Sequence, residues 1–470
     1  MAPPKTHLST RGDVFATPTS KIPLLDVVCD LWHPETNPGG YVSLGVAENT
    51  LMHEEVIAHM TKNFSVDSHS LTYGDGFSGS HRLRDTIARF VNRNFNPHEP
   101  VTKNQLLITS GVGQAIEVTG FSILDKGDGV LLARPHYGNF PIDLGYRVEA
   151  KIIGVSFEET DPFSLETVEV YEKALANAQA QGIHVKALLL CNPHNPLGKA
   201  TPIYAQSRSN IIRGRCYPRE VIEAYMKFCQ KHHVHLISDE IYALSVWKNP
   251  EFPDAPEFTS VLAINPDGVI DRNLIHVFWG MSKDFGSNGI RLGCVISRNE
   301  AFIRACEANS YFTCPSSLSD LATSRILSDD AFVESLTNTN RLRLAENYTM
   351  TAKFLESHKI PYKKGSNAGL FIWVDLFAPI QTQISAGLKK QGESGISSEN
   401  TLGDLQLKLY TTLLKHRIFL ALGAGFGGDV PGWFRIVFAH QKTYLQLGLG
   451  RMMEAVEAFR RELEGDGVKV

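Results

Sequence analysis

The sequence lacks an excess of charge of either sign. It contains 46 Lys and Arg residues against 50 Asp and Glu residues, a formal net charge of −4 at pH 7. Proteins that bind a nucleic-acid backbone need a basic surface, so we exclude nucleic acid as the main partner. The sequence also lacks a run of about 18 apolar residues, which argues against a membrane-spanning helix and a membrane partner.

Cysteine is sparse, with seven residues, an odd number and no Cys-x-x-Cys pair. Disulfide frameworks use even numbers of cysteines, and zinc sites use closely spaced pairs. We therefore expect neither a disulfide framework nor a metal site, and we expect a reducing, cytoplasmic location. The first twenty residues lack the apolar core of a signal peptide, which favours the same location.

A regular alternation of strands and helices fills the middle of the chain. Hydrophobic residues make up 43% of the sequence, as in ordinary soluble globular proteins. Short apolar runs predict strands at 105–109, 129–133, 151–155, 185–191, 234–238, 274–278 and 293–297. An amphipathic stretch over 218–232 predicts a helix between two of them. The pattern predicts an α/β fold with a mostly parallel sheet, whose ligands bind at the carboxyl ends of the strands.

The last third of the chain has a different pattern. It begins with helices and then shows two apolar strands, 369–376 and 433–439, before a final helix that ends near Gly465. We predict a large domain over 51–320 and a smaller α+β domain formed by 1–50 together with 321–470. Two stretches, 199–214 and 385–402, are predicted loop insertions. The first interrupts a motif between Gly198 and Arg215, so it is either a surface loop or a segment absent from the mature protein.

Lys283 is the first candidate for chemistry. It follows the strand at 274–278, among small residues, with Arg291 eight positions further on. A lysine whose pKa is lowered by its surroundings is a nucleophile that forms a Schiff base with a carbonyl. A guanidinium at Arg291 could bind a phosphate through two parallel hydrogen bonds. The residues alone leave open a solvated lysine at a strand end.

Polar residues follow two other strands. Asp239 ends the run at 234–238, and a buried carboxylate needs a cationic partner. The protonated ring nitrogen of pyridoxal phosphate is one such partner, and an N-capping role is the alternative. Tyr242, three residues later, could donate to the O3′ oxygen of that ring. Asn195 lies in a loop with two Asn-Pro pairs, and its amide could donate to the same oxygen.

Three further features fit an anionic or planar ligand. Gly111, Val112 and Gly113 link a strand to a helix, where backbone N–H groups can hold a phosphate; close strand–helix packing explains these glycines equally well. Tyr137 could stack on a planar ring, or it could belong to the core. Arg435 lies inside an apolar strand, so it needs either a substrate carboxylate or an internal salt bridge.

Taken together, these motifs resemble those of the class I and II aminotransferases. The motifs are Asn-Pro-His-Asn-Pro-Leu-Gly (192–198), Ser-Asp-Glu-Ile-Tyr (238–242), Ser-Lys-Asp-Phe-Gly (282–286) and Phe-Arg (434–435). The stretches 44–49, 73–84 and 431–435 resemble the 1-aminocyclopropane-1-carboxylate (ACC) synthase branch. The resemblance covers nearly the whole chain. It implies the fold of PLP-dependent transferases (fold type I), pyridoxal 5′-phosphate as cofactor, and a homodimer whose site is completed across the interface.

The resemblance also implies roles for individual residues. Lys283 would form the Schiff base, and Asp239 and Tyr242 would assist catalysis. The residues implied to hold the cofactor are Gly111, Val112, Gly113, Tyr137, Asn195, Asp239, Tyr242, Ser282, Lys283 and Arg291. Those implied to contact the substrate are Glu48, Tyr73 and Arg435, with Tyr73 reaching across the interface.

The sequence departs from the family pattern at three positions. Gly280 stands where a serine is usual, and Gly113 where a threonine is common, so two hydroxyls are missing from the phosphate site. Phe77 stands where ACC synthases carry a tyrosine, which leaves Tyr73 as the candidate to replace it.

We therefore expect an enzyme that removes the Cα proton of a small-molecule α-amino acid through Lys283. Transamination is the preferred reaction. An ACC synthase-like or C–S lyase elimination is the first alternative, favoured by Glu48. A non-catalytic aminotransferase-like protein is the alternative from another class, and the presence of Lys283 argues against it.

Overall fold

The computed structural model describes residues 7–16, 24–158, 160–196, 216–390, 399–428 and 430–465. The expected insertion at 199–214 lies outside these residues. The second expected insertion, 385–402, is helical at both of its ends. Residues 385–390 lie in α12 (Gln381–Lys390), and 399–402 lie in α13 (Glu399–Lys415). Composition suggested a loop because of the glycines and serines there, but buried apolar residues such as Ile384 anchor α12.

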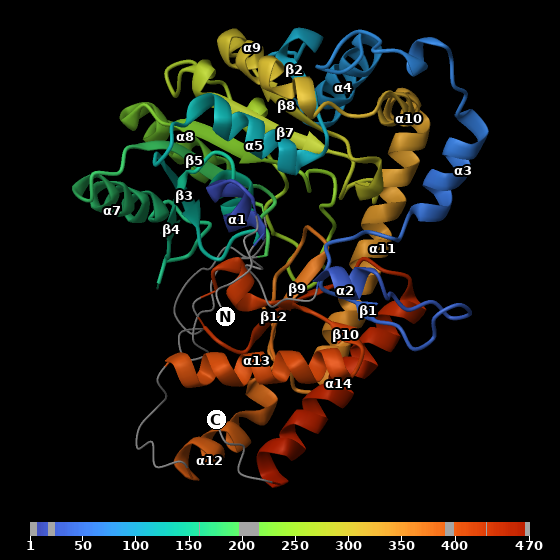
Figure 1. Cartoon of the computed structure of the whole chain (residues 1–470), viewed down its shortest axis with the longest axis vertical. Helices are drawn as coiled ribbons and strands as arrows, with labels where there is room; N and C mark the ends of the chain where they lie inside the picture. Colours follow the sequence, from blue (N-terminus) through green and yellow to red (C-terminus); the bar gives the residue numbers. More distant parts are fainter. Residues whose placement is uncertain are drawn as a thin grey trace.

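A seven-stranded sheet forms the centre of the molecule (Figure 1). Its strands are β2 (Leu106–Thr109), β3 (Gly129–Ala133), β4 (Lys151–Val155), β5 (Val185–Cys191), β6 (His235–Asp239), β7 (Ile275–Gly280) and β8 (Gly293–Ser297). Their order is β2-β8-β7-β6-β5-β3-β4. Strand β8 runs antiparallel to both of its neighbours, β2 and β7, and the other pairs in the sheet are parallel. The expected α/β fold with a mostly parallel sheet is confirmed.

Helices pack against this sheet and bury its apolar side chains. They are α4 (His81–Asn94), α5 (Val112–Ile123), α6 (Phe140–Gly145), α7 (Thr167–Ala180), α8 (Arg219–His232) and α9 (Glu300–Asn309). Helix α8 shows why the periodic pattern forms a helix here. Its buried face includes Val221, Ile222, Tyr225 and Cys229, and it ends at His233 in a left-handed conformation with φ of 54°.

A three-stranded antiparallel sheet, β11-β12-β9, lies below the large sheet in Figure 1. Its strands are β9 (Phe371–Asp375), β11 (Ala421–Leu422) and β12 (Trp433–Val437). The helices of this half are α11 (Asp330–Ser357), α12, α13 and α14 (Lys442–Gly465), whereas α10 (Ser317–Ser328) packs against α4 beside the large sheet. Helix α14 ends at the expected Gly465.

The N-terminal segment contacts both halves of the chain. The ring centre of Phe15 lies 5.4 Å from that of Tyr146, just after α6, whereas residues 42–43 join the second half. The segment contains α1 (Thr10–Ala16), α2 (Leu24–Val28), β1 (Val42–Ser43) and then α3 (His53–Asn63). Strand β1 pairs in parallel with β10 (Ile418–Phe419). This pairing places residues 42–43 with the last third of the chain, while the division that joins 1–50 to 321–470 stays a prediction.

The structure also describes the state of the cysteines and the character of the helices. All seven cysteines are free thiols, and five of them are buried. No helix within the described ranges has the length and apolar character needed to cross a membrane.

Candidate active site

The carboxyl ends of the parallel strands bring most of the expected residues to one edge of the large sheet. Asp239 is the last residue of β6, Asn195 follows β5, and Lys283 follows β7. Tyr137 follows β3. Arg435 comes from β12 of the small sheet, so the site lies where the two halves of the chain meet.

Lys283 is held by the N-terminal segment. Its Nζ donates a hydrogen bond to the carbonyl oxygen of Ala47 at 2.5 Å. Burial, together with the positive charge of Arg435, lowers the pKa of Lys283 to about 8. The carboxylates of Glu48 and Asp239 oppose this shift. A substantial fraction of the amine is therefore unprotonated near pH 8, the state in which it acts as a nucleophile or a base.

Asp239 is a buried carboxylate whose negative charge is not balanced by an ion pair with a described residue. Its side chain is 4% exposed, and burial raises its pKa to about 7. One oxygen accepts a hydrogen bond from the Ile241 N–H at 3.3 Å, so the expected turn-capping role is present. It forms no ion pair with any other described residue. A buried acid in this state has room for a cationic partner.

Arg435, Asn195 and Tyr242 form a hydrogen-bonded chain. Arg435 Nη1 donates to Asn195 Oδ1 at 3.0 Å, and Asn195 Nδ2 donates to the Tyr242 hydroxyl at 3.4 Å. Burial raises the pKa of Tyr242 well above its ordinary value, so the hydroxyl keeps its proton. The chain places an amide and a hydroxyl donor together at the end of β5 and β6.

The guanidinium of Arg435 packs against two aromatic rings. Its central carbon is 4.9 Å from the ring centre of Phe371 and 4.5 Å from that of Phe426. Nη2 donates to the carbonyl oxygen of Gly45 at 2.8 Å, while Nε is buried and has no hydrogen-bond partner. No carboxylate of the described chain forms a salt bridge with Arg435, so the internal salt bridge considered for it is absent. A buried guanidinium with an unpaired donor suits an anion from outside.

Helix α5 begins where the phosphate cradle was expected. Gly111 precedes it with φ of +82°, a conformation that favours glycine, and no side chain caps the helix there. Arg291 lies beside this turn. Its Nη1 donates to the Asn288 carbonyl at 2.8 Å and its Nη2 to the Ser110 carbonyl at 3.2 Å. A side chain at Gly111 would collide with this guanidinium, because a Cβ there would lie 2.5 Å from Nη2.

Gly280 departs from the family pattern for a steric reason. A Cβ at Gly280 would lie 2.7 Å from the Leu292 carbonyl oxygen and 3.2 Å from Val112 Cγ2. β7, β8 and the start of α5 therefore approach too closely for a serine. Ser282, two residues later, is buried at 8% exposure in the segment between β7 and Lys283.

Three further expected residues, Tyr137, Glu48 and Tyr73, lie in different surroundings. Tyr137 is half-buried next to Phe140, with ring centres 5.3 Å apart, and burial raises its pKa to about 12. Glu48 Oε1 accepts a hydrogen bond from Asn288 Nδ2 at 3.0 Å. Tyr73 does not join the group: it is 84% exposed, and its ring contacts that of Phe77 at 5.9 Å.

Sequence reasoning missed several groups at this site. The carbonyls of Gly45 and Ala47 carry no side-chain signal. Phe371 and Phe426 enclose Arg435 from two separate segments, and the glycine run at 423–428 is the only hint of the second. Asp143, on α6, also faces the start of α5.

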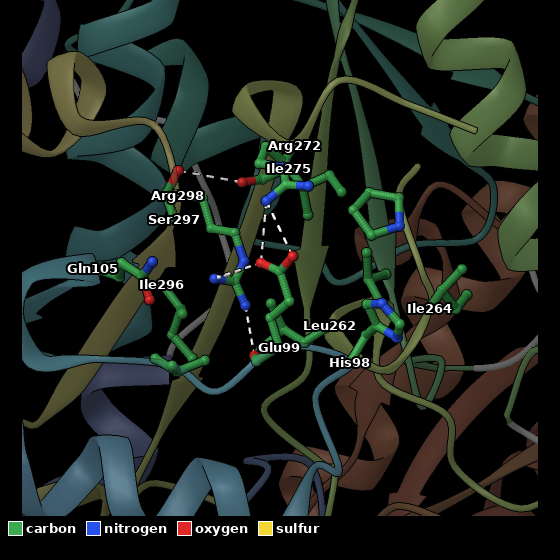
Figure 2. A pocket seen from close by; sticks show the side chains of 13 residues that line it. His98, Glu99, Gln105, Leu262, Ile264, Arg272, Ile275, Ile296, Ser297 and Arg298 are labelled. Atoms are coloured by element: carbon green, nitrogen blue, oxygen red, sulfur yellow. Dashed lines mark hydrogen bonds and ion pairs between the residues drawn. The ribbon is translucent and has the colours of Figure 1, made fainter. Parts of the chain in front are cut away.

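A second hollow lies at the opposite end of β7 (Figure 2). Its lining residues include Arg272, Arg298 and Glu99. Arg272 Nη1 donates to both carboxylate oxygens of Glu99 at 3.1 Å, and Arg298 Nη1 lies 3.2 Å from one of them. Arg272 Nη2 also lies 2.9 Å from Asp267 Oδ1, so two carboxylates balance the two guanidinium groups. Because Ile275 begins β7 while Lys283 follows its end, this hollow is separate from the catalytic candidates.

The comparison with family models now identifies the group to which these residues belong. The model of aminotransferase class I and II matches residues 40–205 and 213–451. The chain belongs to the class I and II aminotransferase family. The family predicted from the sequence motifs is therefore confirmed.

Curated relatives of this family fall into three groups by name. A probable aminotransferase, aclI, of Aspergillus oryzae is 34% identical over 418 residues, covering 87% of this chain and 90% of the relative. An ACC synthase of Glycine max is 30% identical over 436 residues, covering 90% and 82%. A probable inactive ACC synthase-like protein 2 of Mus musculus is 29% identical over 441 residues, covering 92% and 68%.

Solved aminotransferase structures share the fold. The aromatic aminotransferase of Pyrococcus horikoshii superposes with a TM-score of 0.66 at 20% identity, covering 94% of this chain and 100% of that one. The match confirms the PLP-dependent transferase fold.

Class I and II aminotransferases imply pyridoxal phosphate, and the residues present fit it. The buried, uncompensated Asp239 suits a protonated ring nitrogen. The uncapped start of α5 beside Arg291 suits a phosphate. Lys283 has the lowered pKa that Schiff-base formation requires.

Proposed function

We propose that this class I and II aminotransferase-family chain binds pyridoxal phosphate at Lys283 and transaminates an α-amino acid. The observation that carries the proposal is the burial of Lys283 between Asp239 and Arg435, with its pKa lowered to about 8. When bound, pyridoxal phosphate supplies an electron sink that stabilises negative charge at the substrate Cα.

The chain's own residues bind the phosphate and the ring of the cofactor. The start of α5, Ser282 and Arg291 bind the phosphate, and Tyr137 packs against the ring. Asp239 holds a proton on the ring nitrogen, while Asn195 and Tyr242 donate to the ring oxygen.

The substrate is oriented and deprotonated by two residues. Arg435 binds the substrate carboxylate through its unpaired Nε donor, while Phe371 and Phe426 pack against the guanidinium. Lys283 Nζ then accepts the proton from Cα. Delivery of that proton to the cofactor carbon, rather than back to Cα, would make the reaction a transamination.

An ACC synthase-like or C–S lyase reaction is the second candidate. Glu48 favours it, because its carboxylate acts on Lys283 and is held by Asn288. Three incubations distinguish the reactions: S-adenosylmethionine alone, a cysteine S-conjugate alone, and an amino acid with a keto acid. We expect product only from the third. If only the first two release products, transamination is wrong.

Borohydride reduction tests the enzyme proposal itself. The mouse relative named as probably inactive makes a non-catalytic role the alternative. We expect peptide mapping after reduction to find a pyridoxyl group on Lys283. An unmodified Lys283 in protein purified with pyridoxal phosphate would favour the non-catalytic alternative.

A homodimer is proposed from an exposed aromatic patch. The rings of Tyr73, Phe77, Tyr311 and Phe312 follow one another, with ring centres 5.9, 4.6 and 4.9 Å apart. Phe312 is 89% exposed and Tyr73 84% exposed. Contiguous apolar surface of this kind marks an interaction site. The proposed occupant is a second copy, to whose site Tyr73 would contribute.

Replacing Phe312 by aspartate is expected to produce a monomer with reduced activity, because a charge would be buried in the interface. Sedimentation velocity and activity, measured on the same samples, check this. Leu342→Asp is the matched control, since Leu342 is 67% exposed on α11 and lies outside the patch. A wild-type monomer with full activity would contradict the proposed dimer.

The cytoplasmic location also remains a proposal. It is supported by the seven free cysteines, which a reducing compartment would preserve.

A further inference from the structure

Asp143 lies beside the start of α5 without a role in the chemistry above. It belongs to α6, which packs against α5. Both of its carboxylate oxygens are 3.8 Å from the position that a Cβ on Gly113 would occupy. Gly113 is the second residue of α5, so its N–H is among those with no acceptor within the helix. The carboxyl group therefore adjoins the cradle proposed for the cofactor phosphate.

The charged groups around Asp143 do not neutralise it. Glu117 on α5 is negative, and the Tyr137 phenol and the Asp239 carboxyl both sense the charge of Asp143. Arg147, two residues after the end of α6, has its Nη1 3.3 Å from Glu117 Oε1 and so pairs with that carboxylate. Asp143 makes no ion pair within the part of the chain that the structure describes.

The protonated and ionised forms of Asp143 therefore coexist near pH 7. Burial, together with the negative charge of Glu117, raises its pKa to about 7. A phosphate monoester brought to the start of α5 adds negative charge close by. That charge disfavours the carboxylate and favours the neutral acid, which can also donate a hydrogen bond.

We propose that Asp143 is the proton-bearing residue of the cofactor phosphate site: it takes up one proton from solvent when the phosphate ester binds. This proposal rests on the proposed function, since it concerns the same cofactor site. No other bond forms or breaks in this step. Binding is accordingly strongest where Asp143 already carries its proton and weakens as the pH rises through about 7.

Pyridoxamine 5′-phosphate binding to the apoprotein tests the proposal. Its amine cannot condense with Lys283, so the titration of that lysine does not dominate the measurement. Dissociation constants are measured by fluorescence titration between pH 6.5 and 8.5 for the wild type, Asp143→Asn and Asp125→Asn. The last variant removes the same charge at an exposed position after the far end of α5.

We expect Asp143→Asn to bind with nearly wild-type affinity at pH 6.5 and about tenfold more tightly at pH 8.5, since it is permanently neutral. Asp125→Asn should follow the wild type throughout. Pyridoxamine without phosphate should show no difference between Asp143→Asn and the wild type. A wild-type pH dependence in Asp143→Asn, or the same change with pyridoxamine, overturns the proposal.

Calorimetry on the wild type provides a second measurement if Asp143→Asn fails to fold. Titrations at pH 8 in two buffers of different ionisation enthalpy should reveal uptake of about one proton per ligand bound. No uptake overturns the role of Asp143. The failure of the proposed function is distinguishable: in that case pyridoxamine 5′-phosphate does not bind at all and borohydride leaves Lys283 unmodified.

Discussion

Replacing Lys283 by alanine is expected to lower turnover at least about a thousandfold and to abolish borohydride fixation of the cofactor. The variant loses both the covalent attachment and the base that accepts the Cα proton. Asp239, Asn195 and the start of α5 remain, so the cofactor should still bind noncovalently. Turnover is measured with an amino acid and a keto acid, and fixation by mass spectrometry of the reduced protein.

Lys248→Ala is the matched control, because Lys248 is exposed and lies away from the strand edge that carries Lys283. It should behave as the wild type. Addition of a small primary amine should restore part of the activity of Lys283→Ala, since the amine supplies a base in the vacated space. Full turnover without Lys283 would contradict its assignment as the base.

Replacing Asp239 by asparagine is expected to reduce turnover about a thousandfold, with a smaller effect on cofactor binding. Asparagine has nearly the same shape but no negative charge, so the ring nitrogen loses the group that keeps it protonated. The electron sink is then weakened, while contacts to the phosphate persist. Turnover and the cofactor dissociation constant are measured separately to distinguish these effects.

Glu240, the residue after Asp239, is a control for the burial of a carboxylate. It too is buried, but it accepts hydrogen bonds from Ser238 Oγ at 2.9 Å, Ser260 Oγ at 2.6 Å and the Val261 N–H at 2.9 Å. Glu240→Gln should cost about 1–2 kcal/mol of unfolding free energy and leave turnover within about tenfold of the wild type. Equal losses of turnover in both variants would indicate that burial, rather than the partner of Asp239, explains its importance.

The large sheet was predictable because its strands are short, apolar and bounded by polar turns. Four of its seven strands coincide with the expected ranges: β3, β4, β5 and β8. The other three differ by only one or two residues at their ends. β7 extends to Gly280, because the close approach of β8 continues beyond the apolar run.

The candidate residues were predictable where a motif joined a strand end to a reactive side chain, as at Lys283, Asp239 and Asn195. The surroundings that tune them were not. Ala47 contributes only a carbonyl oxygen, and no pattern in a sequence reports where a carbonyl points. The rings around Arg435 come from segments far apart in the chain. Such contacts depend on tertiary packing rather than on local spacing.

The pairing of β1 with β10 has a consequence for the order in which the protein matures during synthesis. The strands of the large sheet all precede residue 300, so that sheet can form while the last third of the chain is still being translated. The segment that carries Gly45 and Ala47 must wait for β10 and β12 before it is fixed against Lys283 and Arg435. Such a long-range pairing is slow to form. A nascent chain would therefore hold a folded sheet but no competent site until it leaves the ribosome.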